Sequence, residues 1–171
     1  TAAILAAIEL GMPAQDAARA ASTFLGAARR FQIRGTVGGV TVVDDYAHHP
    51  TEIGALLDAA RRRYPDATIH VLFQPHLFSR TRFFAPQFAQ ALAKADDVIV
   101  TGVFPARERQ EDFPGVDAHT IADAAAEGAT PIDVVEDMDT AAQMMAMRAK
   151  PGDVIFTVGA GDITTMGPVI V

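Results

Sequence analysis

Short, uninterrupted apolar runs alternate along most of the chain with longer stretches in which polar and apolar residues are mixed. Runs such as IHVLF, DVIVTG and DVIFTV are typical of strands covered on both faces, whereas the mixed stretches favour amphipathic helices. The predicted strands are residues 68–73, 97–103, 131–135 and 153–158, and the predicted helices are residues 49–64, 81–95, 120–127 and 139–149. This alternation predicts an α/β fold with a Rossmann-like, doubly wound and mainly parallel sheet of about six strands.

A hairpin is predicted ahead of these elements. Residues 30–37 and 40–44 are rich in β-type side chains, and Gly38 and Gly39 separate them. Two glycines between such runs favour a tight turn, because glycine adopts positive φ without a steric penalty. We therefore expect residues 30–37 and 40–44 to pair in antiparallel fashion.

The N-terminal segment has a different, alanine-rich pattern. Residues 1–10 and 14–24 are each predicted to form a helix, with Gly11 ending the first. Two such helices can pack on each other, but they bury too little apolar surface to form a domain alone. We interpret them as the edge of a larger structure that the chain lacks.

Composition limits the classes of function. The chain has 171 residues, half of them hydrophobic, a net charge of −7 and no cysteine. The negative charge argues against nucleic acid as the main ligand, and the apolar runs are shorter than the ~20 residues that span a bilayer. No basic segment precedes an apolar one as in a signal peptide. We expect a cytoplasmic protein with no nucleic-acid or membrane partner.

Polar motifs follow three of the predicted strands. They are DDYAHHP at residues 44–50, QPHLFSR at residues 74–80 and GAGD at residues 159–162. Ligands of doubly wound sheets bind outside the carboxyl ends of the strands. The three loops therefore predict one site at that edge of the sheet.

In the first motif, Asp45 and the two histidines are the candidate functional groups. A carboxylate at a strand end beside a helix either caps backbone N–H groups or binds a ribose diol, and the sequence leaves both interpretations open. His48 and His49 are adjacent at the start of a helix, so their side chains diverge by roughly 100° and only one readily faces the cleft. The helix dipole favours the neutral form of such a histidine, which then offers a hydrogen bond.

In the second motif, Gln74, His76 and Arg80 follow a buried strand that does not require them. The planar guanidinium of arginine matches a carboxylate through two parallel hydrogen bonds, which suits the α-carboxylate of an amino acid. The alternative is that an arginine in this motif lies on the surface and pairs with a nearby acid. We expect one of the two arginines, Arg80 and Arg82, to do so. We also expect His48 to share one cleft with His76 and Arg80.

The remaining groups of interest are interpreted as structural. Gly159, Ala160 and Gly161 form neither a dinucleotide fingerprint nor a phosphate loop, so a tight turn is favoured. His70 within a strand and His119 before a short helix are expected to be structural. The sequence contains no G-x-x-x-x-G-K-[ST] motif, no G-x-S-x-G elbow and no cysteine nucleophile. It therefore has no cradle for the β- and γ-phosphates of a nucleotide.

The motifs DDYAHHPTEI, FQPHLFSRTR, GVFPARE and VGAGD, in this order and spacing, resemble the C-terminal domain of the Mur ligases. DYAH-x-P alone is shared with folylpolyglutamate synthases, whereas HHPTE and QPH-x-x-[ST]-R narrow the resemblance to the branch that joins L-alanine to UDP-N-acetylmuramate. The resemblance covers essentially the whole chain. It implies that residues 30–171 are the C-terminal domain and that residues 1–29 are the last helices of a missing, ATP-binding central domain.

The resemblance also implies an activity, namely ATP-dependent amide ligation in peptidoglycan precursor synthesis. ATP and magnesium, held mainly by the central domain, convert the lactyl carboxylate of UDP-N-acetylmuramate to an acyl phosphate, and the amine of L-alanine displaces phosphate. By this resemblance, Arg30 would contact the nucleotide phosphates and Asp45 the ribose. The amino-acid and acyl-phosphate side would be lined by Tyr46, His48, His76 and Arg80. Of these, His48 and Arg80 would be catalytic. No residue is assigned to a metal. Leu77 stands where some members have arginine, so Arg80 alone would bind the carboxylate.

Two other functions compete with this interpretation. A ligase that recycles a preformed tripeptide onto the same sugar resembles DxAHHPT but lacks QPH-x-x-[ST]-R. The alternative from another class is a metal-dependent hydrolase using Asp45, His48 and His76. Two features disfavour it: adjacent histidines diverge, and no third ligand has suitable spacing. Because the phosphate cradle is missing, we expect the chain alone to be inactive.

Overall fold

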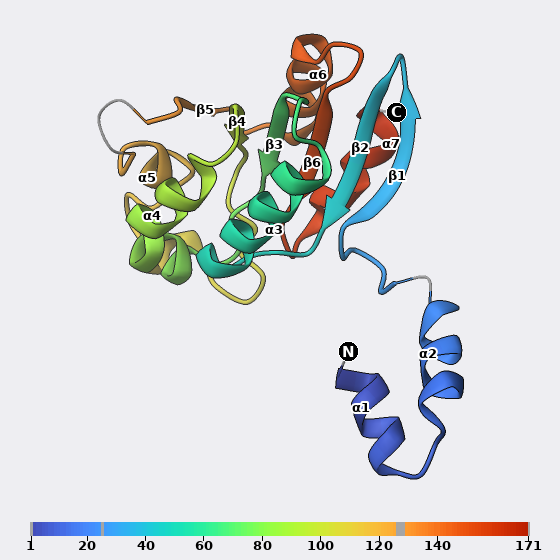
Figure 1. The fold of residues 1–171 in the computed structure, drawn as a ribbon. Coiled ribbons are helices and arrows are strands. Elements are labelled where there is room, and N and C mark those ends of the chain that lie inside the picture. Colours follow the sequence, from blue (N-terminus) through green and yellow to red (C-terminus); the bar gives the residue numbers. More distant parts are fainter. Residues whose placement is uncertain (1, 25, 126–128, 171) are drawn as a thin grey trace.

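The computed structural model describes residues 2–24, 26–125 and 129–170. Its centre is a six-stranded sheet with the order β1-β2-β6-β3-β4-β5 (Figure 1). The strands are β1 (Gln32–Val37), β2 (Val40–Asp45), β3 (Ile69–Phe73), β4 (Asp97–Val100), β5 (Ile132–Val134) and β6 (Val154–Val158). All neighbouring strands pair in parallel except β1 and β2, which pair antiparallel. The predicted mainly parallel sheet with an N-terminal hairpin is confirmed.

The hairpin turns where the sequence predicts it. Gly38 and Gly39 adopt φ of 58° and 82°, values that glycine accepts without strain. The strand β1 begins two residues later than predicted, because Arg29 and Phe31 have φ of 56° and 48° and so cannot belong to a strand. These two left-handed residues turn the incoming chain sharply onto the sheet edge.

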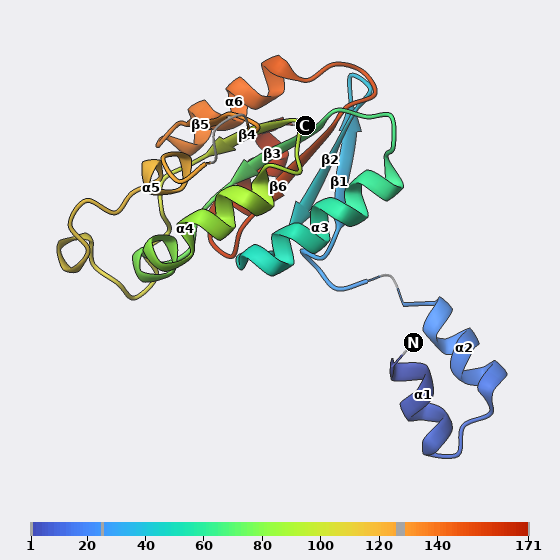
Figure 2. The same cartoon turned by 60° about the vertical axis from the view of Figure 1, so that its left-hand side comes forward.

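Helices cover both faces of the sheet (Figure 2). On one face lie α3 (Pro50–Arg63), α4 (Phe78–Leu92) and α5 (His119–Ala122), and on the other lie α6 (Met138–Arg148), the 3-10 turn η2 (Asp162–Met166) and α7 (Gly167–Ile170). Alternate residues of each central strand face opposite clusters: Val71 and Phe73 pack towards α3 and α4, whereas Leu72 packs towards α6. This double coverage explains the uninterrupted apolar runs.

The helix α4 differs most from its predicted bounds. It begins at Phe78, three residues before the predicted start, so Arg80 lies in its first turn and not in a loop. Leu77 precedes it with φ of 72°, and the Thr81 hydroxyl donates to the Leu77 carbonyl oxygen at 2.9 Å. Pro86 lies inside the helix, and Phe84 has non-helical φ and ψ of −109° and 16°, which kinks it.

Three other predicted segments differ in part from the structure. The strand β4 ends at residue 100, three residues before the predicted end. The helix predicted over residues 120–127 is the four-residue α5, and residues 126 and 127 lie outside the described part of the chain. The predicted irregular loop, residues 105–118, contains the 3-10 turn η1 (Gln110–Asp112).

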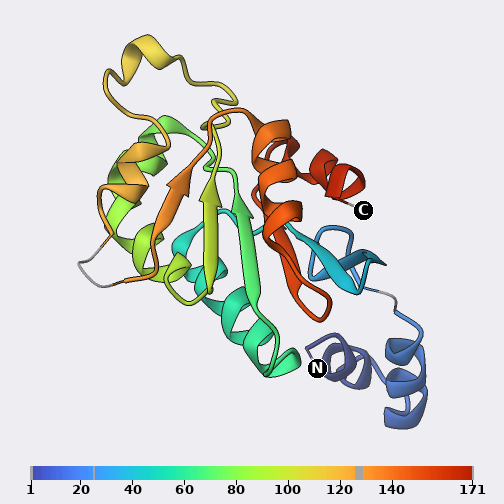
Figure 3. The same ribbon diagram turned by 90° about the horizontal axis from the view of Figure 1, so that it is seen from above.

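The helices α1 (Ala2–Glu9) and α2 (Ala14–Ser22) pack on each other and lie apart from the sheet in all three views (Figures 1 to 3). Of their described residues only Ala17 is buried. Large apolar side chains such as Leu10 and Phe24 are exposed at 90% and 72%. Within the described ranges, no helix has the length and apolar character needed to cross a membrane.

The amino ends of the strands are held by a buried histidine. His70 of β3 places Nδ1 2.9 Å from Asp97 Oδ2 and Nε2 3.1 Å from Asp153 Oδ2. Both bonds form at once when the ring carries both protons and donates to each carboxylate. Arg148 of α6 adds a bond to Asp97 at 2.8 Å. The predicted structural role of His70 is thereby given a physical basis, because it ties β3 to β4 and β6.

We predict that His70→Leu lowers the free energy of unfolding by about 1–3 kcal/mol, because two carboxylates then face an apolar side chain. Urea unfolding monitored by circular dichroism measures the change. His119→Leu is the matched control, since His119 is exposed at the start of α5 and should shift stability by less than about 0.5 kcal/mol. If His70→Leu and the parent chain are equally stable, His70 does not stabilise the fold by joining β3 to β4 and β6.

Candidate functional site

The loops that follow β2, β6 and β3 meet at one edge because these three strands are neighbours. Main-chain hydrogen bonds continue beyond the strand ends. The N–H of Gly159 donates to the carbonyl oxygen of Asp45 at 3.1 Å, and the N–H of Gln74 donates to that of Val158 at 2.9 Å. The three motifs are therefore joined through their backbones before any side chain is considered.

Arg80 links the two histidines that the sequence placed at this edge. Its Nη1 donates to the carbonyl oxygen of His48 at 3.4 Å and lies 3.5 Å from Nδ1 of His76. The two imidazole rings have centroids 5.8 Å apart in an edge-to-face arrangement. These three residues therefore meet at one edge of the sheet. The expectation that they share one cleft, and the roles assigned to them, stay predictions. The open hollow beside Arg80 is lined by Leu77, Ser79, Arg82, Phe83 and Phe84 and by neither histidine.

The hydrogen bonds of His48 define which ring nitrogen is free. Nδ1 lies 2.9 Å from the carbonyl oxygen of Tyr46. Since a carbonyl oxygen only accepts, Nδ1 carries a proton, and Nε2 of the neutral ring is an acceptor. Glu52 accepts the backbone N–H of His48 at 3.0 Å. Burial raises the pKa of Glu52, but this bond and nearby positive charge outweigh it and lower the pKa overall.

His76 has the opposite arrangement. Arg80 only donates, so Nδ1 of His76 accepts and Nε2 of the neutral ring carries the proton. Burial, followed by the positive charge of Arg80, lowers the pKa of His76, which keeps the ring neutral near pH 7. The ring also stacks on Phe104, with centroids 5.8 Å apart. The site thus offers an acceptor on His48 and a donor on His76.

His49 turns away from this pair. Its Nδ1 accepts the N–H of Thr51 at 3.3 Å, which caps the start of α3, and its ring packs against Phe84. Pro50 occupies the first helical position, where its missing N–H costs nothing. The expectation that adjacent histidines diverge and that one of them caps or packs is confirmed.

Two features at the start of α4 were not assigned from the sequence. Leu77 is buried despite its positive φ, and its N–H donates to the carbonyl oxygen of Phe104 at 2.9 Å. Glu108 accepts the N–H of Ser79 at 3.0 Å and also its hydroxyl. Burial raises the pKa of Glu108, but the two Ser79 bonds lower it overall. The loop after β4 therefore braces the helix turn that carries Arg80.

Asp45 accepts hydrogen bonds from two backbone N–H groups. One carboxylate oxygen accepts the N–H of Ala47 at 2.8 Å, and the other accepts the N–H of Phe31 at 2.7 Å. The side chain is almost fully buried. Of the two interpretations left open by the sequence, the hydrogen bonds show the capping of backbone N–H groups. A ribose contact stays a prediction.

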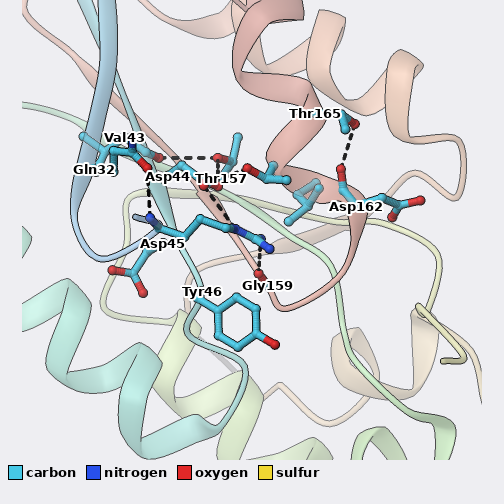
Figure 4. Close-up of polar contacts among 12 residues, drawn as sticks. Gln32, Val43, Asp44, Asp45, Tyr46, Thr157, Gly159, Asp162 and Thr165 are labelled. Atoms are coloured by element: carbon cyan, nitrogen blue, oxygen red, sulfur yellow. Dashed lines mark hydrogen bonds and ion pairs between the residues drawn. The ribbon is translucent and has the colours of Figure 1, made fainter. Parts of the chain in front are cut away.

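The junction before β1 brings both arginines of the ARRF segment to Tyr46. The guanidinium carbon of Arg29 lies 4.9 Å from the ring centroid of Tyr46, and that of Arg30 lies 5.6 Å from it. Arg29 also bonds to the buried Asp44 and to the carbonyl oxygen of Gly159. Figure 4 shows Gly159 near the ring of Tyr46. The sequence analysis gave Arg29 no role.

The GAGD loop does more than turn the chain. Asp162 accepts a bond from the Gln74 amide at 2.6 Å, and the N–H of Ile163 donates to the same amide's oxygen at 3.1 Å. A Cβ on Gly161 would lie 2.6 Å from Phe104 Cγ and overlap the Gln74 oxygen, so only glycine fits. The tight-turn interpretation is incomplete, since the loop locks the second motif.

The described ranges contain no group of three His, Cys, Asp or Glu side chains placed to hold a metal ion. Asp45, His48 and His76, the ligand set of the hydrolase alternative, each have the other partners given above. The geometry therefore gives that alternative no support.

One family model matches this chain. It is the Mur ligase, glutamate ligase domain, and it covers residues 29–161, which include the first two polar motifs and the first three residues of the third. The chain belongs to this family.

Curated relatives of this Mur ligase domain carry a more specific name. The chain is 71% identical over 174 aligned residues to the UDP-N-acetylmuramate–L-alanine ligase of Bifidobacterium longum subsp. infantis, covering 99% of the chain. It is 49% identical to the ligase of the same name from Paenarthrobacter aurescens. The alignments cover 34% and 36% of those proteins. The chain thus spans about a third of the length of the relatives it matches.

Solved structures agree with this placement. A UDP-N-acetylmuramate–alanine ligase from Thermotoga maritima superposes with a TM-score of 0.78 at 29% identity, covering 98% of this chain and 34% of that one. A murein peptide ligase from Psychrobacter arcticus gives a TM-score of 0.71 at 26% identity, covering 98% and 34%.

We predict that Arg80→Gln raises the pKa of His76 in this Mur ligase domain. Removing a neighbouring positive charge favours the protonated ring, so the pKa moves upward towards its ordinary value. Titration of the imidazole proton resonances by NMR measures it. Arg82→Gln is the control, because Arg82 is exposed and lies over Phe113, not His76. An unchanged His76 titration in Arg80→Gln would mean that burial alone sets the pKa.

Proposed function

We propose that this chain is the amino-acid-binding domain of an ATP-dependent ligase that joins L-alanine to UDP-N-acetylmuramate in the synthesis of peptidoglycan precursors in the cytoplasm. The observation that carries the proposal is that His48, His76 and Arg80 contact one another at one edge of the sheet. These residues belong to two of the family's motifs. The substrates are those in the names of the relatives.

The substrate carboxylate is assigned to Arg80. Nη1 of the guanidinium contacts the His48 carbonyl and the His76 ring, so further N–H groups of Arg80 can bind a ligand. Leu77 is buried with an apolar side chain and adds no second cation. A single charge-assisted contact of about 1.5–3 kcal/mol is sufficient to orient a small amino acid once water is excluded.

The two histidines suit opposite halves of the condensation. ATP transfers its γ-phosphoryl group to the sugar carboxylate and leaves as ADP. The alanine amine then attacks the acyl carbon, the C–O bond to phosphate breaks, and phosphate leaves. We assign the departing ammonium proton to Nε2 of His48, which is an acceptor, and the developing oxyanion to the Nε2–H of His76. Tyr46 lies beside His48, with ring centroids 5.2 Å apart, and completes the amino-acid side.

ATP and magnesium are assigned mainly to a preceding domain. Residues 30–171 would then be the C-terminal domain, and residues 1–29 the last helices of the nucleotide-binding one. Arg30, exposed beside Tyr46, fits a phosphate contact from the junction. Asp45 is assigned to the ribose, because each of its carboxylate oxygens accepts one backbone N–H group and has a further lone pair for a hydroxyl. Magnesium is usually bound by one or two carboxylates, waters and substrate phosphates, and we assign it to ATP and the preceding domain.

The tripeptide-recycling ligase remains the nearest alternative, because its fold is the same. The sequence motif QPH-x-x-[ST]-R favours L-alanine over the tripeptide. A ligase assembled with this domain and offered each amine in turn would distinguish the two through the product formed.

In a ligase that contains this domain, Arg80→Ala should raise the KM for L-alanine about ten- to a hundredfold while the KM for ATP changes little. The reason is the loss of one charge-assisted contact to the α-carboxylate. Steady-state kinetics with each substrate varied in turn measures the split. Arg82→Ala serves as the control on the exposed side of the same helix. Loss of ATP affinity with an unchanged KM for alanine would move Arg80 to the nucleotide side.

The chain alone should hold ATP weakly or not at all and should ligate nothing. Arg30 and Asp45 would contact the nucleotide from one side only, and two such contacts do not offset a loss of translational and rotational freedom of at least ~4 kcal/mol. Isothermal calorimetry with ATP and magnesium tests this. A dissociation constant in the low micromolar range would show a self-contained nucleotide site. Adding the remaining domains in trans should restore alanine-dependent ATP hydrolysis.

A further inference from the structure

Arg30 stands between two residues that are each fixed in an unusual conformation. Arg29 and Phe31 have φ of 56° and 48°, a region that residues with a Cβ rarely adopt. Such conformations persist when surrounding contacts hold them. The contacts on either side of Arg30 therefore decide where its guanidinium stands.

Arg29 is held by both its side chain and its backbone. Its Nε donates to Asp44 Oδ2 at 3.2 Å and its Nη2 to the carbonyl oxygen of Gly159 at 2.6 Å. Its N–H donates to the Gln32 side chain at 2.8 Å, and its carbonyl oxygen accepts the N–H of Tyr46 at 2.8 Å. One residue thus joins the incoming chain to β1, β2 and the loop after β6.

Asp44 gives this anchorage its strength. Its side chain is fully buried, and besides Arg29 it accepts bonds from the hydroxyls of Thr157 at 2.9 Å and Thr164 at 2.8 Å. Figure 4 shows the carboxylate of Asp44 beside Thr157. The two hydroxyls are neutral, so the guanidinium of Arg29 is the cation that compensates the buried charge. A buried carboxylate left without its cation is strongly disfavoured, which keeps Arg29 in place.

The other neighbour of Arg30 is held by the next residue of the same motif. The N–H of Phe31 donates to Asp45 at 2.7 Å, and the ring of Phe31 packs edge-on against Phe156 with centroids 5.4 Å apart. The consecutive aspartates at the end of β2 therefore hold the two residues that flank Arg30. Asp44 holds a side chain, and Asp45 holds a backbone N–H.

We propose that Arg29 and Asp44 are positioning residues, whose ion pair fixes the junction so that Arg30 stands beside Tyr46 and presents its guanidinium to an anionic phosphate ligand. The placement of Arg30 follows from the contacts of this chain, and only the identity of its ligand rests on the proposed function. Because Nε and Nη2 of Arg29 are engaged with Asp44 and Gly159, the proposal assigns Arg29 to positioning and Arg30 to the ligand.

The first test uses the 171-residue chain and does not depend on catalysis. Arg29→Gly removes the side chain and accommodates the positive φ, so it isolates the ion pair from backbone strain. Hydrogen exchange followed by NMR should show the amides of Phe31 and Tyr46 exchanging about tenfold faster or more, with β3 unchanged. Asp44→Asn should loosen the same amides, and Arg29→Lys should restore part of the protection. Unchanged exchange in Arg29→Gly would overturn the proposal.

The second test uses a ligase that contains this domain. Arg30→Ala and Arg29→Gly should each raise the KM for ATP about tenfold, with the KM for L-alanine nearly unchanged. Arg62→Ala, at an exposed arginine of α3, is the matched control. A normal KM for ATP in Arg29→Gly beside an impaired Arg30→Ala enzyme would overturn the positioning role. If Arg30→Ala itself has no effect, the phosphate assignment of the proposed function fails, and hydrogen exchange alone then decides whether the junction is held.

Discussion

Parallel pairing of β6 between β2 and β3 is the constraint on which the site depends. These strands enter the sheet from distant parts of the sequence, yet Asp45, Val158 and Phe73 end in register. The backbone bonds of Gly159 and Gln74 extend this register into the loops. Any change that moved β6 would separate the first motif from the second, so the buried Val154–Val158 strand supports the site as directly as any polar contact does.

Burial divides the polar groups at this edge into two kinds. Asp44, Asp45 and Gln74 are almost fully buried, and among the described residues every buried side-chain nitrogen or oxygen has a hydrogen-bond partner. We therefore interpret these groups as supports, because their hydrogen bonds join neighbouring segments of the chain. His48 and Arg80 are partly exposed and keep a ring nitrogen and guanidinium N–H groups beyond their contacts within the chain. Chemistry is assigned to this second kind.

Much of the fold could be predicted because double coverage of the sheet leaves an unmistakable apolar pattern, and Gly38-Gly39 encodes its turn locally. The start of α4 could not be predicted, because Leu77 adopts a positive φ at a position where no glycine indicates one. The convergence of His48, His76 and Arg80 followed from strand order. The role of Arg29 could not be predicted, because its partner Gly159 is 130 positions away and adjacent arginines look alike in a sequence.

The exposure of the site explains why a well-formed edge is still incomplete. Arg80 sits beside an open hollow, where water competes for its N–H groups and screens its charge. The same guanidinium becomes far more effective when a second surface excludes that water, because Coulomb attraction grows as the local dielectric falls. The supports already hold His48, His76 and Arg80 in contact. In the ligase that we propose, closure would therefore need only to remove solvent and bring the acyl phosphate, so that the geometry would lie in this domain and the reacting phosphate in its partner.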